Sequence, residues 1–210
     1  MELPSSPVRR AVLAATEKLL GTTTLHDLSV SAIIADAGVS RPTFYAYYPS
    51  KFAVVAELLR NVFAEVFDSV QPWLSAEGQE RPELTLRTIL KDAADLLHEH
   101  GAVIRAAHEN TQVDPVIGRE WFSIMQRFRE ALRTELIAVH TRDGRAPGPD
   151  IELLASTLIW SSERVFYLST LGIDPSLRGP DDAVEGLMTI WVPAIYGIPY
   201  RPSAEEASGP

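Results

Sequence analysis

The sequence predicts an all-α fold of about nine helices. Apolar residues recur every three to four positions over nearly the whole chain, which is the period of an α-helix. Alternating apolar and polar runs, the pattern of β-strands, do not occur, and neither do internal repeats. Glycine and proline interrupt the helical pattern at intervals. With 46% hydrophobic residues, these helices can bury the core of a globular protein.

The first expected helix begins at Ser6-Pro7 and ends at Gly21. Proline is tolerated in the first turn of a helix because its missing N–H would be unpaired there in any case. The apolar residues that supply the buried face of this helix are Val12, Leu13, Leu19 and Leu20.

Two short helices follow, at about 30–37 and 41–47. Each is preceded by a serine, Ser29 or Ser40, whose side chain can accept a hydrogen bond from the first turn. Gly38 lies between them, where the chain must turn sharply through a positive φ that only glycine adopts without steric cost. Two helices of about two turns joined in this way indicate a helix-turn-helix, a motif that many proteins use to bind DNA.

The second short helix is expected to have a buried side and an outward side. The residues expected to pack the two short helices together are Ile33, Ile34, Ala37, Val39 and Phe44. Those left to face phosphates and base edges in the major groove are Arg41, Thr43, Tyr45 and Tyr47. Short helices around a glycine also occur in proteins that never bind DNA. Exposed tyrosines, expected at 45, 47 and 48, favour a binding surface over that alternative.

A longer helix is expected from Lys51 to about Gln71, where Pro72 closes it. Polar or glycine- and proline-rich breaks at 74–82 and 144–150 separate the helices that follow. These later helices are expected at 83–99, 102–110, 115–142, 150–171 and 181–196.

The net charge of −9 is unusual for a DNA-binding protein, but the charge is unevenly distributed. Residues 1–52 hold five basic and four acidic side chains, whereas the remaining 158 residues hold 14 and 24. Only the near-neutral N-terminal part could therefore approach DNA, and its few cations predict weak non-specific binding.

Some classes of protein are excluded by composition. The chain has no cysteine, which rules out disulfides and thiol chemistry. It also has no apolar run of about 20 residues and no secretion signal, so we expect a cytoplasmic protein with no membrane partner.

Residues 11–61 resemble the DNA-binding domain of the TetR family of regulators. The first helix ends in a double leucine, and the segment GVSRPTFYAYYPSK (38–51) is a highly specific signature of that family. The resemblance implies a repressor that binds double-stranded operator DNA. The DNA-binding residues that it implies are Ser40, Arg41, Pro42, Thr43, Tyr45, Tyr47 and Lys51, the lysine gripping a phosphate. The N-terminal MELPSSPV lacks the basic arm of many relatives, so extra minor-groove contacts are not expected.

The rest of the chain is similar to one branch of this family, the ethionamide-resistance repressors. The matching segments are EWFSIMQRF (120–128), SERVF (162–166) and TIWVPAIYG (189–197). This similarity implies a largely apolar chamber for a hydrophobic small-molecule effector, whose binding spreads the two DNA-reading heads of a homodimer. The ligand-binding residues implied are Leu86, Ala93, Trp121, Met125, Phe128, Ile159, Ser162, Tyr167 and Trp191. Without it, a stripe such as Trp121, Met125 and Phe128 would be taken for ordinary core.

Leu86 and Ala93 replace larger aromatic residues of those relatives, and Ile159 and Ser162 replace a pair of asparagines. We therefore expect a chamber that is broader near Leu86 and less able to hydrogen-bond a ligand amide at Ile159.

The last two helices are expected to pair with their copies in the homodimer. The apolar stripes expected at that interface are Ile151, Leu154, Leu158 and Val165, and Leu187, Ile190, Trp191 and Ile195. Because Pro193 lacks an N–H, the last helix is expected either to kink there or to end its regular part near Val192, giving a bend or break between Thr189 and Tyr196.

These inferences divide the chain into three parts. We predict a helix-turn-helix DNA-binding domain at 1–50, a ligand-binding and dimerisation domain at 51–197, and a disordered tail at 198–210.

An enzyme acting on an apolar substrate is the main alternative, but the sequence offers no catalytic motif, cofactor loop or metal site. The pair His98 and His100 does not suit zinc, because residues two apart diverge on a helix. A purely architectural DNA-binding protein is a third possibility, which the long acidic C-terminal part disfavours. A regulator that activates transcription is the alternative to a repressor.

Overall fold

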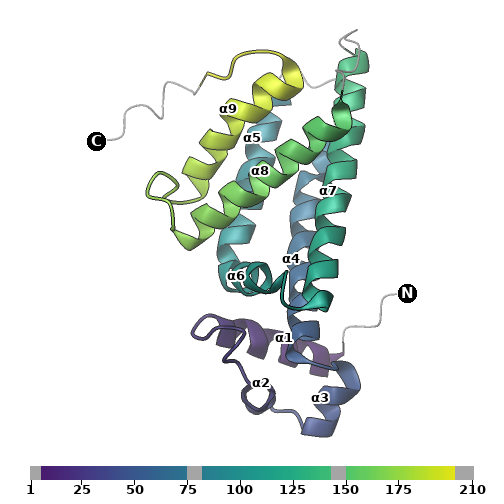
Figure 1. The fold of residues 1–210 in the computed structure, drawn as a ribbon, viewed down its shortest axis with the longest axis vertical. Coiled ribbons are helices and arrows are strands. Elements are labelled where there is room, and N and C mark those ends of the chain that lie inside the picture. Colours follow the sequence, from purple (N-terminus) through teal and green to yellow (C-terminus); the bar gives the residue numbers. More distant parts are fainter. Residues whose placement is uncertain (1–5, 75–81, 143–149, 202–210) are drawn as a thin grey trace. The chain divides into compact units, whose positions relative to one another are not determined.

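The computed structural model describes residues 6–74, 82–142 and 150–201, and over these residues the fold is all-α. Nine helices and no strands occur in the described part of the chain, which confirms the predicted fold class (Figure 1). Their bounds are α1 Pro7–Leu20, α2 Val30–Ala37, α3 Arg41–Tyr47, α4 Lys51–Leu74, α5 Pro82–Glu99, α6 Gly101–Asn110, α7 Pro115–Arg142, α8 Ile151–Leu171 and α9 Pro180–Tyr196. None of these helices is long and apolar enough to cross a membrane.

The chain forms two compact units. The first comprises Met1–Ala64 with His100–Ile124, and the second comprises Glu65–Glu99 with Met125–Pro210. Helices α4 and α7 each contribute their first part to the first unit and their remainder to the second. The first unit thus contains the predicted helix-turn-helix together with α6.

In the first unit, α1 packs against α2 and α6, and α2 packs against α3. The largest fully buried side chains of this unit are Leu20, Leu25, Ile33, Phe44, Leu59 and Ile117. Two of them, Ile33 and Phe44, are residues that the sequence predicted would hold the two short helices together.

In the second unit, α5, α8 and α9 pack against one another (Figure 1). Its largest fully buried side chains are Leu86, Leu136, Leu158, Leu187, Met188 and Ile195. A charged pair also joins α5 to α9, since Arg87 of α5 bonds Glu185 of α9. The hydroxyl of Tyr200, which follows α9, donates to the same carboxylate at 2.8 Å.

The capping serines predicted for the two short helices, Ser29 and Ser40, are confirmed, and Ser6 caps α1 in the same way. Ser6, Ser29 and Ser40 each accept a hydrogen bond on the side-chain oxygen from a backbone N–H of the following turn. Gly38 adopts a φ of 65° at the end of α2, the conformation for which glycine was expected there. The local chemistry of the helix-turn-helix is therefore as the sequence predicts.

The predicted end of α4 at Gln71 is wrong, because the helix continues through Pro72 to Leu74. Trp73 is buried, and its indole Nε1 donates a hydrogen bond to the Tyr196 hydroxyl at 2.9 Å. We attribute the extra turn to this contact, which compensates for the backbone hydrogen bond that proline cannot make.

The predicted end of α9 near Val192 is also wrong. The helix runs through Pro193 to Tyr196, and Gly197 ends it with a φ of 69°. Val192 and Ile195 are both fully buried, so the apolar surface that continued helix buries outweighs the hydrogen bond lost at proline.

Three predicted features lie wholly or largely outside the described residues. These are most of the polar linker at 74–82, most of the glycine- and proline-rich break at 144–150, and residues 202–210 of the expected tail.

Candidate nucleic-acid interface and ligand region

The start of the recognition helix α3 is held by its capping serine. The Ser40 Oγ accepts a hydrogen bond from the Thr43 N–H at 3.2 Å and lies 2.7 Å from the Thr43 hydroxyl oxygen. Thr43 was predicted to face DNA, and its hydroxyl is shared with this cap while its side chain is half-buried. Pro42 is exposed in the first turn, where its missing N–H costs nothing.

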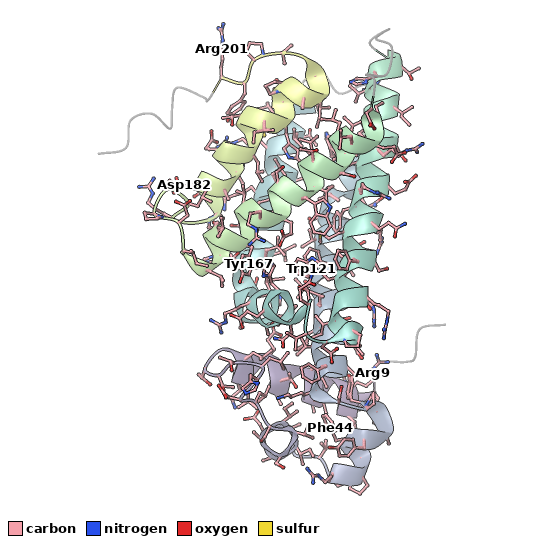
Figure 2. The ribbon with its side chains drawn as sticks, viewed as in Figure 1. Arg9, Phe44, Trp121, Tyr167, Asp182 and Arg201 are labelled. Atoms are coloured by element: carbon pink, nitrogen blue, oxygen red, sulfur yellow. The ribbon has the colours of Figure 1, made fainter. Side chains whose placement is uncertain are left out.

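The outward side of α3 carries an arginine and two tyrosines. Arg41 is exposed, and Tyr45 and Tyr47 are 47% and 44% exposed. The Arg41 guanidinium lies over the Tyr45 ring, 5.9 Å from its centroid. Phe44 anchors the opposite side of the helix, fully buried within the first unit (Figure 2). An exposed tyrosine pair beside an arginine can donate hydrogen bonds to phosphate oxygens and base edges.

The expectation that Tyr48 is exposed is wrong, because its side chain is only 3% exposed. Tyr48 packs against Phe44, with ring centroids 6.0 Å apart, and burial raises the pKa of its hydroxyl to about 12. It lies beside Arg9 of α1 and Glu57 of α4, whose side chains are joined at 2.6 Å. This cluster ties the end of α3 to α1 and α4. Adjacent tyrosines look alike in sequence, so only the packing distinguishes them.

Lys51, predicted to grip a phosphate, already binds backbone oxygens. Its ammonium donates to the carbonyl of His26 at 2.9 Å and to that of Leu28 at 2.8 Å. A lysine ammonium has three donors, so one N–H remains for a phosphate oxygen while the other two hold the loop before α2. No pattern in the sequence indicates this structural role of Lys51.

Eight of the nine residues predicted to bind a ligand lie in the second unit, on α5, α7, α8 and α9. The buried ones are Leu86, Ala93, Met125, Ser162, Tyr167 and Trp191. Phe128 and Ile159 are half-buried. The ninth, Trp121, lies in the first unit, where it is buried against the rings of Phe63 and His108, each 5.8 Å from it.

Two polar groups of this region, the Trp191 indole and the Ser162 hydroxyl, are engaged with each other. The Trp191 indole Nε1 donates to the Ser162 hydroxyl at 3.0 Å, and that hydroxyl donates to the Leu158 carbonyl at 2.9 Å. Trp191 also packs against Trp73, with ring centroids 6.2 Å apart. Ser162 therefore keeps one acceptor position and no donor for a ligand, and the region is mostly apolar.

The apolar stripes predicted to form the dimer interface are wrong for half of their residues. Four of the eight residues are buried inside the chain: Leu158, Leu187, Trp191 and Ile195. The large apolar side chains exposed on α8 and α9 are instead Leu153, Trp160 and Ile190, at 62%, 40% and 48%. Leu153 and Trp160 are seven residues apart and so share one side of α8. Of these three, the sequence-based prediction had named only Ile190.

In the described ranges, no group of three or more His, Asp or Glu side chains could hold a metal ion. His100, half of the histidine pair considered above, instead contacts Glu17 of α1, with Nδ1 2.6 Å from Oε1.

Two family models match the chain. The model "Bacterial regulatory proteins, tetR family" matches residues 12–58, and the model "Transcriptional regulator EthR, C-terminal domain" matches residues 86–197. The first covers α2, α3 and most of α1, and the second covers most of α5 and all of α6 to α9.

Named relatives cover most of the chain. The HTH-type transcriptional regulator EthR of Mycobacterium tuberculosis (strain ATCC 25618 / H37Rv) is 34% identical over 190 residues, 89% of this chain and 86% of the relative. EthR of Mycolicibacterium smegmatis is 30% identical over 200 residues, 92% of this chain and 89% of the relative. A solved putative TetR-family regulator from Syntrophomonas wolfei has a TM-score of 0.71 at 14% identity, covering 90% of this chain and 95% of its own.

Proposed function

The chain belongs to the TetR family of bacterial transcriptional regulators, with an EthR-type C-terminal domain, and we propose that it is a ligand-responsive repressor. In this proposal a homodimer binds a palindromic operator in the cytoplasm and releases it when a hydrophobic small molecule binds the C-terminal domain. The domains and relatives are those of transcriptional regulators and not of enzymes.

The outward side of α3 carries the DNA-binding part of the proposal. Arg41, Tyr45 and Tyr47 are exposed on a helix whose other side is anchored by fully buried Phe44. The folding of a single chain does not require two exposed tyrosines on a seven-residue helix. A contact with the major groove of DNA uses both the hydroxyls and the rings of such tyrosines.

The exposed apolar residues of α8 and α9 support the homodimer. Leu153, Trp160 and Ile190 would be buried by a second copy of the chain, and two-fold symmetry would present the same side chains from each protomer. One helix-turn-helix makes few base contacts. A dimer doubles them and fixes the spacing between the half-sites of a palindrome.

The buried apolar residues of the second unit support a hydrophobic effector. Leu86, Met125 and Tyr167 come from three different helices, and mostly apolar walls with few polar groups are typical of small-molecule sites. Because Trp191 and Ser162 satisfy each other, a ligand rich in hydrogen-bond donors would find few acceptors among these residues. We therefore propose an elongated apolar amide or ester.

The DNA-binding part is tested with the promoter fragment adjacent to the gene, by fluorescence anisotropy at physiological salt. Arg41→Ala should weaken specific binding by about 1–3 kcal/mol, and Tyr45→Ala should also weaken it. Arg119→Ala is the matched control, since Arg119 is an exposed arginine on α7. If both α3 variants bind as tightly as wild type, α3 does not read the operator.

The effector part is tested by a thermal-shift screen of long-chain amides and esters. A ligand that weakens operator binding must itself bind less tightly to the operator complex, because the two equilibria are linked. Hits should therefore raise the melting temperature and release DNA in the same concentration range. Stabilising hits that leave operator affinity unchanged would mean that the site has no regulatory role.

A further inference from the structure

The basic side chains of α1–α3 differ in what already binds them. Arg9 is held by Glu57 at 2.6 Å, and Lys18 by Asp36 at 2.6 Å. Within residues 6–47, the other two basic side chains, Arg10 and Arg41, are exposed and have no carboxylate or carbonyl partner. A guanidinium carries five N–H donors and stays charged, so these two arginines are available to an anion.

Arg10 lies on α1, whose two ends bond the two helices of the helix-turn-helix. Ser6 and Arg10 are four residues apart, which places them on the same side of α1, and Lys18 lies two turns further along the helix. At one end of the helix, the Ser6 Oγ donates to the Tyr47 hydroxyl of α3 at 3.1 Å. At the other end, the Lys18 ammonium donates to Asp36 of α2 at 2.6 Å. Arg10, one turn after Ser6, is therefore beside the end of α3 that carries Tyr47.

We propose that Arg10 binds a phosphate of the operator duplex, extending the DNA-binding surface from α3 onto α1. In a helix-turn-helix complex the second helix occupies the major groove, which is flanked by the phosphates of both strands. A cation beside the end of that helix meets the flanking phosphates and not the base edges, so it positions the protein without reading sequence. The inference rests on the proposed function, because it assumes that α3 enters the groove of an operator.

The test measures how binding depends on salt. An operator is first selected with the wild-type protein from random-sequence duplexes, and its affinity is then followed by anisotropy across a KCl series. Arg10→Ala should lower the slope of log K against log [KCl] by about 0.9 for each Arg10 in the bound assembly. It should weaken the operator and a scrambled duplex by the same factor. Arg10→Lys, which keeps the charge, should restore the slope.

Two comparisons make the result specific. Arg119→Ala should leave the slope unchanged, and Arg41→Ala should weaken the operator more than the scrambled duplex. Among the described residues Arg10 has no ion-pair or hydrogen-bond partner, so Arg10→Ala should melt at the wild-type temperature.

The possible failures are distinguishable. A wild-type slope for Arg10→Ala overturns the inference while the proposed function stands. A loss confined to the operator overturns it as well, because that result marks a base contact. If the wild-type protein selects no duplex at all, both the inference and the proposed function are wrong.

Discussion

Glu135 illustrates at the scale of one residue how burial makes stability depend on pH. Its side chain is 9% exposed on α7, near the buried residues Leu132, Leu136 and Val139. Burial raises the pKa of this carboxyl, and the charge of Arg142 opposes the shift only in part. The folded protein thus binds this proton more tightly than the unfolded chain does, so the charged carboxylate disfavours folding at neutral pH.

We predict that Glu135→Gln raises the free energy of unfolding at neutral pH. The gain should shrink as the pH falls through the raised pKa, and vanish below the ordinary glutamate value of about 4.3, where both states are protonated. Urea unfolding at several pH values measures this, with Asp92→Asn, an exposed carboxylate of α5, as the control. A gain that stayed constant with pH would show that titration of Glu135 is not its cause.

The ion pairs of α1 make a second prediction at this scale. Arg9 and Glu57 are largely buried around Tyr48, whereas Lys18, which pairs with Asp36, is 71% exposed. Arg9→Met should lower the free energy of unfolding by about 1–3 kcal/mol, because it leaves the Glu57 carboxylate without its charged donor. Lys18→Met should cost no more than about 1 kcal/mol. Equal losses in chemical denaturation would contradict the role assigned to the Arg9 cluster.

At the scale of helices, the sequence predicted the boundaries made by capping residues better than the ends assigned to prolines. Ser29, Ser40 and Gly38 act through backbone groups a few residues away, so their roles can be recognised locally. Pro72 and Pro193 were expected to end their helices, but distant contacts decide the matter, such as that between Trp73 and Tyr196. A sequence pattern cannot weigh a lost backbone hydrogen bond against a tertiary contact that it does not contain.

Replacing Pro193 should therefore stabilise α9. In Pro193→Ala, the new N–H can bond the Thr189 carbonyl, and we expect a higher melting temperature, with a gain of up to about 3 kcal/mol. Pro180→Ala, at the first turn of the same helix, is the control, since no backbone bond is available there and no gain is expected. A Pro193→Ala variant no more stable than Pro180→Ala would show that α9 has adapted its local geometry to the proline.

At the scale of the whole molecule, the spacing of apolar residues shows that a helix has an apolar and a polar side. It does not show which neighbouring helix or chain covers each side. For α8 and α9 it could not distinguish the core of one chain from a surface shared by two. Leu158 and Leu187 are core, while Leu153 and Trp160 were missed because they lie outside the richest apolar stripe. The outward residues of α3 were predictable by contrast, since a seven-residue helix with one fully buried side chain, Phe44, leaves few alternatives.

The exposed surface of Leu153, Trp160 and Ile190 leads to the last prediction. If a second copy covers it, Trp160→Glu removes the indole and places a charge in each half of an apolar interface. We expect the variant to sediment as a monomer at concentrations at which the wild type is a dimer. Operator affinity should fall at the same time, because a monomer reads one half-site. Since Trp160 is 40% exposed in the single chain, the helical circular dichroism of the monomer should be preserved.

Val113→Glu, the control, changes an exposed apolar residue in the first unit and should leave both the oligomeric state and the operator affinity unchanged. A Trp160→Glu protein that stays dimeric would place the interface elsewhere, whereas a monomer with full operator affinity would show that half-site pairing is not what makes binding tight.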